Sequence, residues 1–353
     1  MNTEIVSSHE PAKAVTLLRA GEIVALPTET VYGLAADALN PVAVAKIFEA
    51  KERPSFDPLI VHLPDRDWLE RIAKIDNQSQ EVIEKLIAQF WPGPLTLVLD
   101  RQSIVPEIVT AGLDTVAVRI SEHPIFAEIV REFGSPLAAP SANRFGRVSP
   151  TTAQHVLDEL SGRIPLIVDA GPTRHGIEST IIAPRGDKID ILRSGPITEE
   201  QLRVRGFQPM SHRQEADATK ISTPGQLPSH YAPKTPVQLV NDAQSFSPKP
   251  NHRCALLAWN AVENGRRFIA IRRLSQRGDL CEAAVNLFRF LRELDALDVD
   301  LIVAERVPDQ GLGAAINDRL ERASGRGRLT SMARGRFGEG PDLNHLDRRD
   351  TPG

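Results

Sequence analysis

A polar segment from Gly206 to Pro236 divides this chain of 353 residues into two stretches of mixed strand and helix patterns. No apolar periodicity survives in the segment, and its prolines at 209, 224, 228, 233 and 236 are typical of a linker. Because a domain usually has ~100–200 residues, the length fits two domains. We therefore predict two α/β domains, residues 1–205 and 237–330, joined by a linker at 206–236.

The first stretch mixes strands and helices in an irregular order. Residues Glu22–Leu26 form a predicted buried strand, which follows an amphipathic stretch from Pro11 to Arg19. Further strands are predicted at 59–63, 95–99, 115–120, 137–139, 166–169, 179–183 and 189–192, and helices at 43–50, 80–89, 124–133 and 152–160. This irregular order favours a large mixed sheet over a doubly wound one.

The second stretch is shorter and more regular. It contains predicted strands at 237–240, 254–259, 268–272 and 301–305, and predicted helices at 279–297 and 314–323. This order indicates a small α/β domain with a parallel sheet. The tail at 331–353 is rich in Gly, Arg and Asp, so we predict that it is flexible.

Bulk composition limits the class of function. The formal net charge is −4, whereas a protein that binds duplex nucleic acid nonspecifically is usually basic, because its cations neutralise phosphates. No apolar run approaches the ~18 residues of a membrane helix, and the N-terminus lacks the basic and apolar regions of a secretory signal. We therefore expect a cytoplasmic protein, with no membrane partner, whose primary substrate is not nucleic acid.

The usual nucleotide fingerprints are absent, since the sequence contains neither GxxxxGK[ST] nor a GxGxxG between a strand and a helix. In PTETVYGLAAD (27–37), Glu29 could hold magnesium or pair with a cation, although the pattern alone favours a turn closed by threonine side chains. In KERPSFDPLIVH (51–62), Lys51 and Arg53 could clamp phosphates or could complement the dipole of the helix that they end. His62 ends an apolar run, and a lone histidine there is more often a core residue than a ligand.

Two later segments place hydroxyl, amide and guanidinium groups at predicted strand ends. LAAPSANRFGRVSPT (137–151) offers Ser141, Asn143 and two arginines, which favours anion binding. HGIESTIIAP (175–184) offers Ser179, and Arg119 and Arg193 each end a predicted strand. A buried arginine must find an anion, because an unpaired buried charge is very costly. No Ser–His–Asp or Cys–His arrangement can be assigned, which disfavours a nucleophilic triad.

Six short segments, in order along the first stretch, resemble the landmarks of the Sua5/YrdC/YciO family: PTETVYGL, KERP…DPLIVH, WPGPLT, VAVRI, APSAN and IESTI. Each piece is weak alone, but the ordered set is specific. The family's Lys-x-Arg and Ser-x-Asn motifs correspond to Lys51, Arg53, Ser141 and Asn143. TPGQLPSHYAPKTP (223–236) and GLGAAINDRLERAS (311–324) resemble the linker and C-terminal signatures of the two-domain Sua5 type.

The resemblance implies a YrdC-like first domain with a large twisted sheet and a cationic cleft, and a smaller Rossmann-like second domain. It also implies a nucleotidyltransferase that makes threonylcarbamoyl-AMP and pyrophosphate from ATP, L-threonine and bicarbonate. The product supplies the N6-threonylcarbamoyl group of adenosine-37 in tRNA. The protein would position the reactants and neutralise charge, with Mg²⁺ held mainly by the ATP phosphates. A separate transferase complex would act downstream, so tRNA is at most an indirect or weak partner.

The resemblance implies a role for each matched residue. Lys51 and Arg53 are the implied catalytic residues. The residues implied to face ATP are Lys51, Arg53, Asp57, Thr115, Ser141, Asn143, Ser149, Arg193, His230 and Tyr231. Those implied to hold threonine are Thr30, His62, Arg119, Ala139 and Ser179. Arg119 suits the carboxylate, since a guanidinium can donate two parallel hydrogen bonds.

Two matched positions raise questions of their own. Asp57 stands where many relatives have Asn, and an acid beside triphosphate would repel it unless it faces magnesium. His230 and Tyr231 lie in the linker, and we predict that they close over the nucleotide as a lid rather than form a passive spacer.

Two other functions stay open on the sequence. A carbamoyl-adenylate-forming module of hydrogenase maturation proteins shares the YrdC-type domain, but those chains carry zinc-finger regions. This chain has only two cysteines, Cys254 and Cys281. An RNA-binding regulator could use the same cationic cleft, although the acidic net charge and the retained motif residues argue against it.

Overall fold

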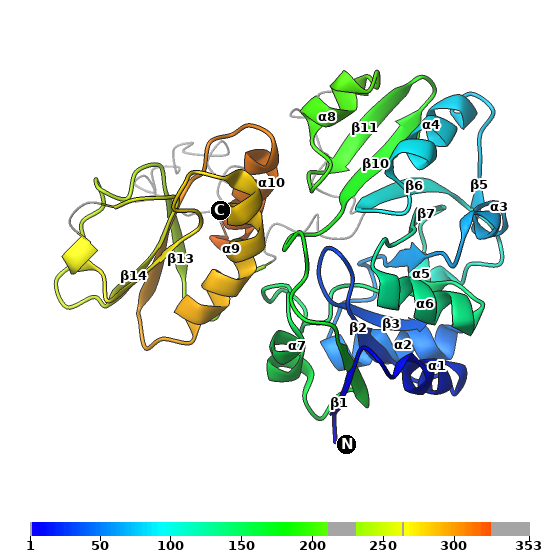
Figure 1. Cartoon of the computed structure of the whole chain (residues 1–353), viewed down its shortest axis with the longest axis horizontal. Helices are drawn as coiled ribbons and strands as arrows, with labels where there is room; N and C mark the ends of the chain where they lie inside the picture. The colour runs from blue at the N-terminus through cyan, green and yellow to red at the C-terminus, as the bar shows by residue number, and fades with distance from the viewer. Residues whose placement is uncertain (1, 211–230, 263–264, 326–353) are drawn as a thin grey trace, which may run out of the picture.

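The computed structural model describes residues 2–210, 231–262 and 265–325. Figure 1 shows two lobes, of which the larger is built on a 12-stranded sheet and the smaller on a four-stranded one. Most of the predicted linker, including His230, and the predicted tail at 331–353 lie outside the described residues.

The large sheet mixes parallel and antiparallel pairs, which confirms the predicted mixed architecture. Its strands lie in the order β1-β9-β2-β3-β8-β4-β7-β6-β10-β11-β12, and β5 pairs with β6. They span β1 Glu4–Ser7, β2 Val24–Leu26, β3 Gly33–Asp37, β4 Ile60–His62, β5 Ala73–Lys74, β6 Leu95–Arg101, β7 Thr115–Arg119, β8 Leu137–Ala138, β9 Leu166–Asp169, β10 Thr180–Arg185, β11 Lys188–Arg193 and β12 Pro209–Met210.

Helices cover both faces of this sheet. Along β2, Ala25 faces a core built with α2, α4 and α7, whereas Val24 and Leu26 face a second core built with α1 and α6. This alternation follows from the period of two in a strand. The helices of this lobe span α1 Pro11–Arg19, α2 Pro41–Lys51, α3 Leu69–Ile72, α4 Gln80–Phe90, α5 Glu107–Thr110, α6 Pro124–Phe133, α7 Ala153–Leu160 and α8 Glu199–Val204, with a 3₁₀ turn at Arg66–Trp68.

Local sequence explains where the helices next to the pocket described below begin and end. The side chain of Asn40 accepts hydrogen bonds from the first turn of α2, and Pro41 follows it. Glu52 then ends α2 in the left-handed conformation, which turns the chain away directly after Lys51. The helix therefore delivers the Lys51-x-Arg53 motif into a loop.

The smaller sheet is entirely parallel, as predicted, with the order β13-β16-β14-β15. Its strands are β13 Val237–Val240, β14 Cys254–Ala258, β15 Ala270–Arg273 and β16 Leu301–Glu305, and its helices are α9 Leu280–Asp295 and α10 Leu312–Ala323, with a 3₁₀ turn at Gly265–Arg267. Figure 1 shows α9 and α10 on the side of this sheet that faces the larger lobe. Their apolar side chains share one core with Val31, Val148 and Ile177 of that lobe.

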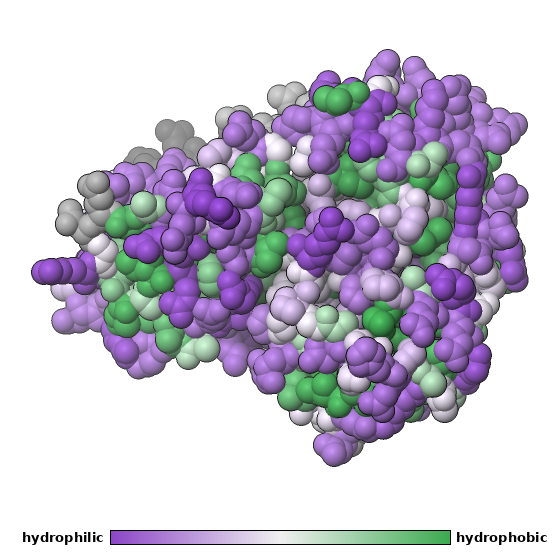
Figure 2. Space-filling view, in the orientation of Figure 1, coloured by the Kyte–Doolittle hydropathy of each residue, from purple (hydrophilic) through white to green (hydrophobic). Residues whose placement is uncertain are grey.

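The molecular surface seen in Figure 2 is mostly hydrophilic, and its apolar residues form separate patches. Within the described residues, no helix combines the length and apolar character needed to cross a membrane.

Candidate active site

A pocket lies over the face of the large sheet opposite its α2 and α4 core. In β4 and β7, Ile60 pairs with Ala117 and His62 with Arg119, so these side chains share one face. Val61, between Ile60 and His62, belongs to the core on the other face. The pocket is lined by Thr28, Thr30, Val31, Gly33, Arg53, Ile60, His62, Arg119, Ala139, Pro140, Ser141, Glu178, Ser179, Arg193 and Tyr231.

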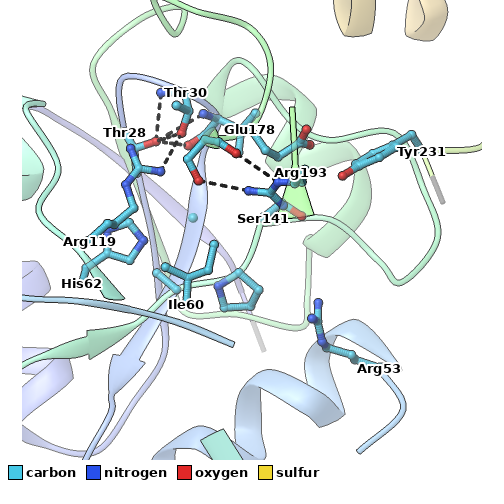
Figure 3. Close-up of a pocket in the computed structure, with 15 residues that line it drawn as sticks. Thr28, Thr30, Arg53, Ile60, His62, Arg119, Ser141, Glu178, Arg193 and Tyr231 are labelled. Carbon is cyan, nitrogen blue, oxygen red and sulfur yellow. Dashed lines mark hydrogen bonds between the residues drawn. The ribbon is translucent and has the colours of Figure 1, made fainter. Parts of the chain in front are cut away.

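The predicted residues gather in this pocket in two groups. All five residues assigned to threonine line it, together with four of those assigned to ATP: Arg53, Ser141, Arg193 and Tyr231. In Figure 3, Thr28, Thr30, Arg119 and His62 lie on one side, and Arg53 and Tyr231 lie on the other. Residues assigned to threonine and residues assigned to ATP therefore line the same pocket.

Arg119 is the cation of the first side. Its guanidinium is buried and donates to Glu29 Oε1 and, at 3.3 Å, to Thr30 Oγ1. Ser121 donates to the second oxygen of Glu29. Burial alone would raise the pKa of Glu29, but Arg119 and Ser121 lower it below its ordinary value. Glu29 therefore pairs with a cation, which is one of the two functional roles that its sequence left open.

His62 lies beside Arg119 and is neutral. Burial, and then Arg119, hold its pKa well below the ordinary value for histidine. The ring contacts Phe126, with centroids 4.7 Å apart, and its Nδ1 finds no hydrogen-bond partner among the described residues. An unpartnered ring nitrogen at a pocket wall can accept a hydrogen bond from a ligand or donate one.

Arg53 is the cation of the second side and is fixed by the loop that carries it. Its Nη2 lies 2.8 Å from the carboxylate of Asp57 and donates to Pro58 O at 2.9 Å. Burial raises the pKa of Asp57, while Arg53 and Lys51 oppose that shift. Asp57 itself is fully buried and does not line the pocket, so its immediate role is to orient Arg53.

Lys51 and Asn143 hold the neighbouring loop instead of facing the pocket. The Lys51 ammonium is buried and donates to the backbone carbonyls of Ser141 and Asn143. The Asn143 amide donates to Arg144 O and Arg147 O, at 2.8 and 2.9 Å. Half of the motif quartet thus shapes the loop that presents Ser141.

Ser149, Ser179 and Arg193 belong to a hydrogen-bonded wall. Ser149 Oγ donates to Glu178 Oε1 at 2.5 Å, and both side chains are buried. Arg193 donates from Nε to Ser179 O and from Nη2 to Ser179 Oγ, both at 3.0 Å. A residue assigned to ATP therefore contacts one assigned to threonine.

Tyr231 closes the second side of the pocket. It is buried, has φ +62°, and packs on Phe288 of α9 with ring centroids 5.5 Å apart. The next amide, of Ala232, donates to Gly146 O at 2.9 Å, which anchors the chain beside the Ser141 loop. Burial, then Glu178, raise the pKa of Tyr231 to about 12, so the phenol is neutral.

Thr115 lies apart from the other assigned residues. It begins β7, whereas Arg119 ends it, and four residues of extended chain separate their Cα atoms by about 13 Å. Thr115 instead lines a separate hollow with Lys74 and Asp100. Thr115 does not line the pocket that holds Arg119, and its place near the nucleotide stays a prediction.

Glu178 is the charged pocket residue that the sequence analysis did not single out. It stands inside IESTI, directly before Ser179, so its place in a matched segment could have marked it as a candidate site residue. Its importance depends on partners far away in the sequence.

Known proteins match this architecture along nearly the whole chain. The family model described as telomere recombination, named for Sua5, YciO and YrdC, matches residues 16–195, and that of the threonylcarbamoyl-AMP synthase C-terminal domain matches residues 197–325. A threonylcarbamoyl-AMP synthase of Bacillus subtilis is 41% identical over 335 residues, which are 92% of this chain and 96% of that protein. The chain belongs to the Sua5 family of threonylcarbamoyl-AMP synthases.

A second relative, from Pyrococcus abyssi, matches in both sequence and structure. The Pyrococcus abyssi threonylcarbamoyl-AMP synthase is 41% identical over 324 residues, covering 88% of this chain and 93% of its own. The crystal structure of P. abyssi Sua5 complexed with L-threonine matches with a TM-score of 0.81 and 36% identity, over 92% of this chain and 98% of that one. The Sua5 fold, with both of its parts, is thus present here.

Proposed function

We propose that this pocket joins AMP to the carbamate of threonine. The threonine amine adds to carbon dioxide, or to bicarbonate with loss of hydroxide, and gives up a proton. A carbamate oxygen then attacks the α-phosphorus of ATP, and the bond to pyrophosphate breaks. The observation that carries this proposal is that two buried cations, Arg119 and Arg53, line one pocket from opposite sides.

The residue roles follow from position and charge. Arg119, held from behind by Glu29, binds the threonine carboxylate, while Thr30, His62, Ala139 and Ser179 surround the rest of the amino acid. Arg53, Ser141 and Arg193 face the phosphates and stabilise the charge that develops on the departing pyrophosphate. Tyr231 closes the nucleotide side, and the lid role of the linker remains a prediction.

Magnesium enters this proposal on the nucleotide. In the described part of the chain, no group of three or more His, Cys, Asp or Glu side chains could hold a metal ion. Of the acids near the phosphate cations, Asp57 faces Arg53, and Glu178 is held by Ser149 and Arg319. Mg²⁺ commonly keeps its waters and is bound through substrate phosphates, which fits this residue set, and no step is assigned to a protein-bound metal.

The test of this function is pyrophosphate release from ATP, Mg²⁺ and bicarbonate, with threonine compared with serine, alanine and no amino acid. We expect release that requires both threonine and bicarbonate. Folded protein without threonine-dependent release would refute the proposal and leave a carbamoyl-adenylate or RNA-binding function. We further propose that the product passes to a tRNA-modifying transferase in the cytoplasm.

Two charge-conserving variants separate the two sides of the pocket. Arg53→Lys and Arg119→Lys each keep the charge and lose the planar fork, which is worth about 1.5–3 kcal/mol per charged hydrogen bond. We expect Arg53→Lys to raise KM for ATP by roughly 10- to 100-fold and Arg119→Lys to raise KM for threonine by a similar factor. An exchange of these effects, or no effect, would contradict the assignment.

A further inference from the structure

Arg319 of α10 is a fully buried arginine that serves the larger lobe. Its exposed fraction is 0%, and its Nε donates to Glu178 Oε2 at 3.1 Å, 141 positions earlier in the sequence. Its Nη1 donates to Ser194 O at 2.6 Å, and its guanidinium lies 5.6 Å from the centre of the Tyr231 ring. A buried guanidinium destabilises a fold unless it is paired, so this position is built around its partners.

Those partners lead directly to the nucleotide side of the pocket. Glu178 lines the pocket, and the oxygen not used by Arg319 accepts the hydrogen bond from Ser149. Ser194 directly follows Arg193, another lining residue. One guanidinium therefore fixes the carboxylate that orients the Ser149 hydroxyl, the backbone beside Arg193, and the face of Tyr231.

Helix α9, which packs against α10, is fixed on the larger lobe and so gives Arg319 of α10 a defined place. Arg292 of α9 donates to Val148 O and pairs with Glu159 at 3.2 Å. Gly176 lies so close to α9 that a Cβ atom added to it would stand 2.5 Å from Val285 Cα. Hydrogen bonds and close backbone packing thus fix the contact between α9 and the larger lobe, which we call the seam between the lobes.

The hydrogen bonds on the threonine side stay within the larger lobe. Arg119 is held by Glu29 and Thr30, and Glu29 is held by Ser121. The contacts described above from α10 lead instead to Ser149 and Arg193, which we assign to ATP, and reach the threonine group only through the hydrogen bonds from Arg193 to Ser179.

We infer that Arg319 is a positioning residue for the nucleotide site, through which the C-terminal lobe completes a pocket whose lining belongs mostly to the other lobe. The inference rests on the proposed function. In this arrangement the second lobe sets Glu178, Ser149 and Arg193 for the phosphates of ATP and leaves threonine binding to the first lobe.

The test compares Arg319→Lys and Arg319→Met with wild type in two binding measurements and one kinetic one. Isothermal titration with L-threonine alone should give the wild-type affinity within about twofold. The affinity for α,β-methylene-ATP with Mg²⁺ should fall by roughly 10- to 100-fold in Arg319→Met, because the charged hydrogen bonds that hold Glu178 and the Ser194 backbone are lost. KM for ATP should rise in parallel, and Arg319→Lys should recover part of the loss.

A matched control is Glu200→Ala, which removes another contact between the lobes, the 3.0 Å hydrogen bond from Gly311 N, away from the pocket lining. It should leave both affinities unchanged. Equal weakening of threonine and nucleotide binding in Arg319→Met would overturn the inference, as would unchanged nucleotide affinity. The binding titrations need no turnover. Failure of this inference is therefore distinguishable from failure of the proposed function, which would appear as wild-type protein without threonine-dependent pyrophosphate release.

Ser149→Ala keeps the inference testable if Arg319→Met does not fold. This change breaks the far end of the chain of contacts without altering the seam between the lobes. If Arg319 acts through Glu178 and Ser149, the two changes should not add. The double variant Arg319→Lys/Ser149→Ala should then have the same nucleotide affinity as whichever single variant binds nucleotide less tightly. Additive losses would show that Arg319 acts by another route.

Discussion

Replacing Lys51 by Met tests whether this lysine holds the protein or its substrate. Its ammonium donates to the carbonyls of Ser141 and Asn143, and its exposed fraction is 1%. Methionine has a similar length and no donor, so the change leaves both buried carbonyls without this partner. We expect a loss of stability centred on the Ser141 loop, in addition to a loss of activity.

The magnitude follows from the two lost contacts. A hydrogen bond from a charged donor contributes about 1.5–3 kcal/mol, so two contribute about 3–6 kcal/mol. Removing an ammonium from a buried site offsets part of this loss, because desolvation already holds the pKa of Lys51 well below its ordinary value. A net loss of about 3 kcal/mol is expected, which is roughly 6–12 °C in melting temperature at ~2–4 °C per kcal/mol.

The assay is thermal unfolding without ligands, together with hydrogen exchange of the segment 137–147. Arg53→Lys is the matched control, because Arg53 faces the pocket and a lysine there keeps the charge beside Asp57. Arg53→Lys should lose ATP affinity and should lose less stability than Lys51→Met, because the lysine keeps a charged contact with Asp57. The structural role would be refuted if Lys51→Met had the melting temperature and hydrogen exchange of wild type but did not use ATP. Lys51 would then be assigned to phosphate binding.

Two further perturbations test the seam and the buried histidines. Gly176→Ala should lower the melting temperature and make the boundary between the lobes more sensitive to proteases, because φ of Gly176 is +72° and the new Cβ would clash with Val285. The control is Gly171→Ala, where φ is +78° and no atom lies within 4 Å of the new Cβ. This control carries only the backbone strain of about 1–2 kcal/mol. His62 has a folded pKa below its unfolded value of about 6.5, so the unfolded state binds more protons and stability falls as pH drops below about 6.5. In chemical denaturation, His62→Gln should reduce that slope by up to about 1.4 kcal/mol per pH unit; equal slopes would contradict the assigned pKa direction.

Local sequence patterns predicted most elements of the fold. The amphipathic stretch at Pro11–Arg19 is α1, and the predicted bounds of α6, β13 and β16 match the structure residue for residue. Strand β3, Gly33–Asp37, was not predicted, because Gly and Ala carry no strand signal and their burial comes from neighbouring strands. The periodicity of apolar residues indicates which face of a segment is buried. It does not identify the segments that pack on that face.

The sequence alone also placed the assigned threonine residues and Arg53, Ser141 and Arg193 as a group, through ordered motifs whose residues do line one pocket. Tertiary structure decided which cations face that pocket. Lys51 turned out to hold carbonyls 90 and 92 positions away, and Arg319 reached Glu178 across the seam between the lobes. A buried charge takes the acceptor that packing brings to it, and that acceptor is set by the meeting of distant segments rather than by the residues beside it in the chain.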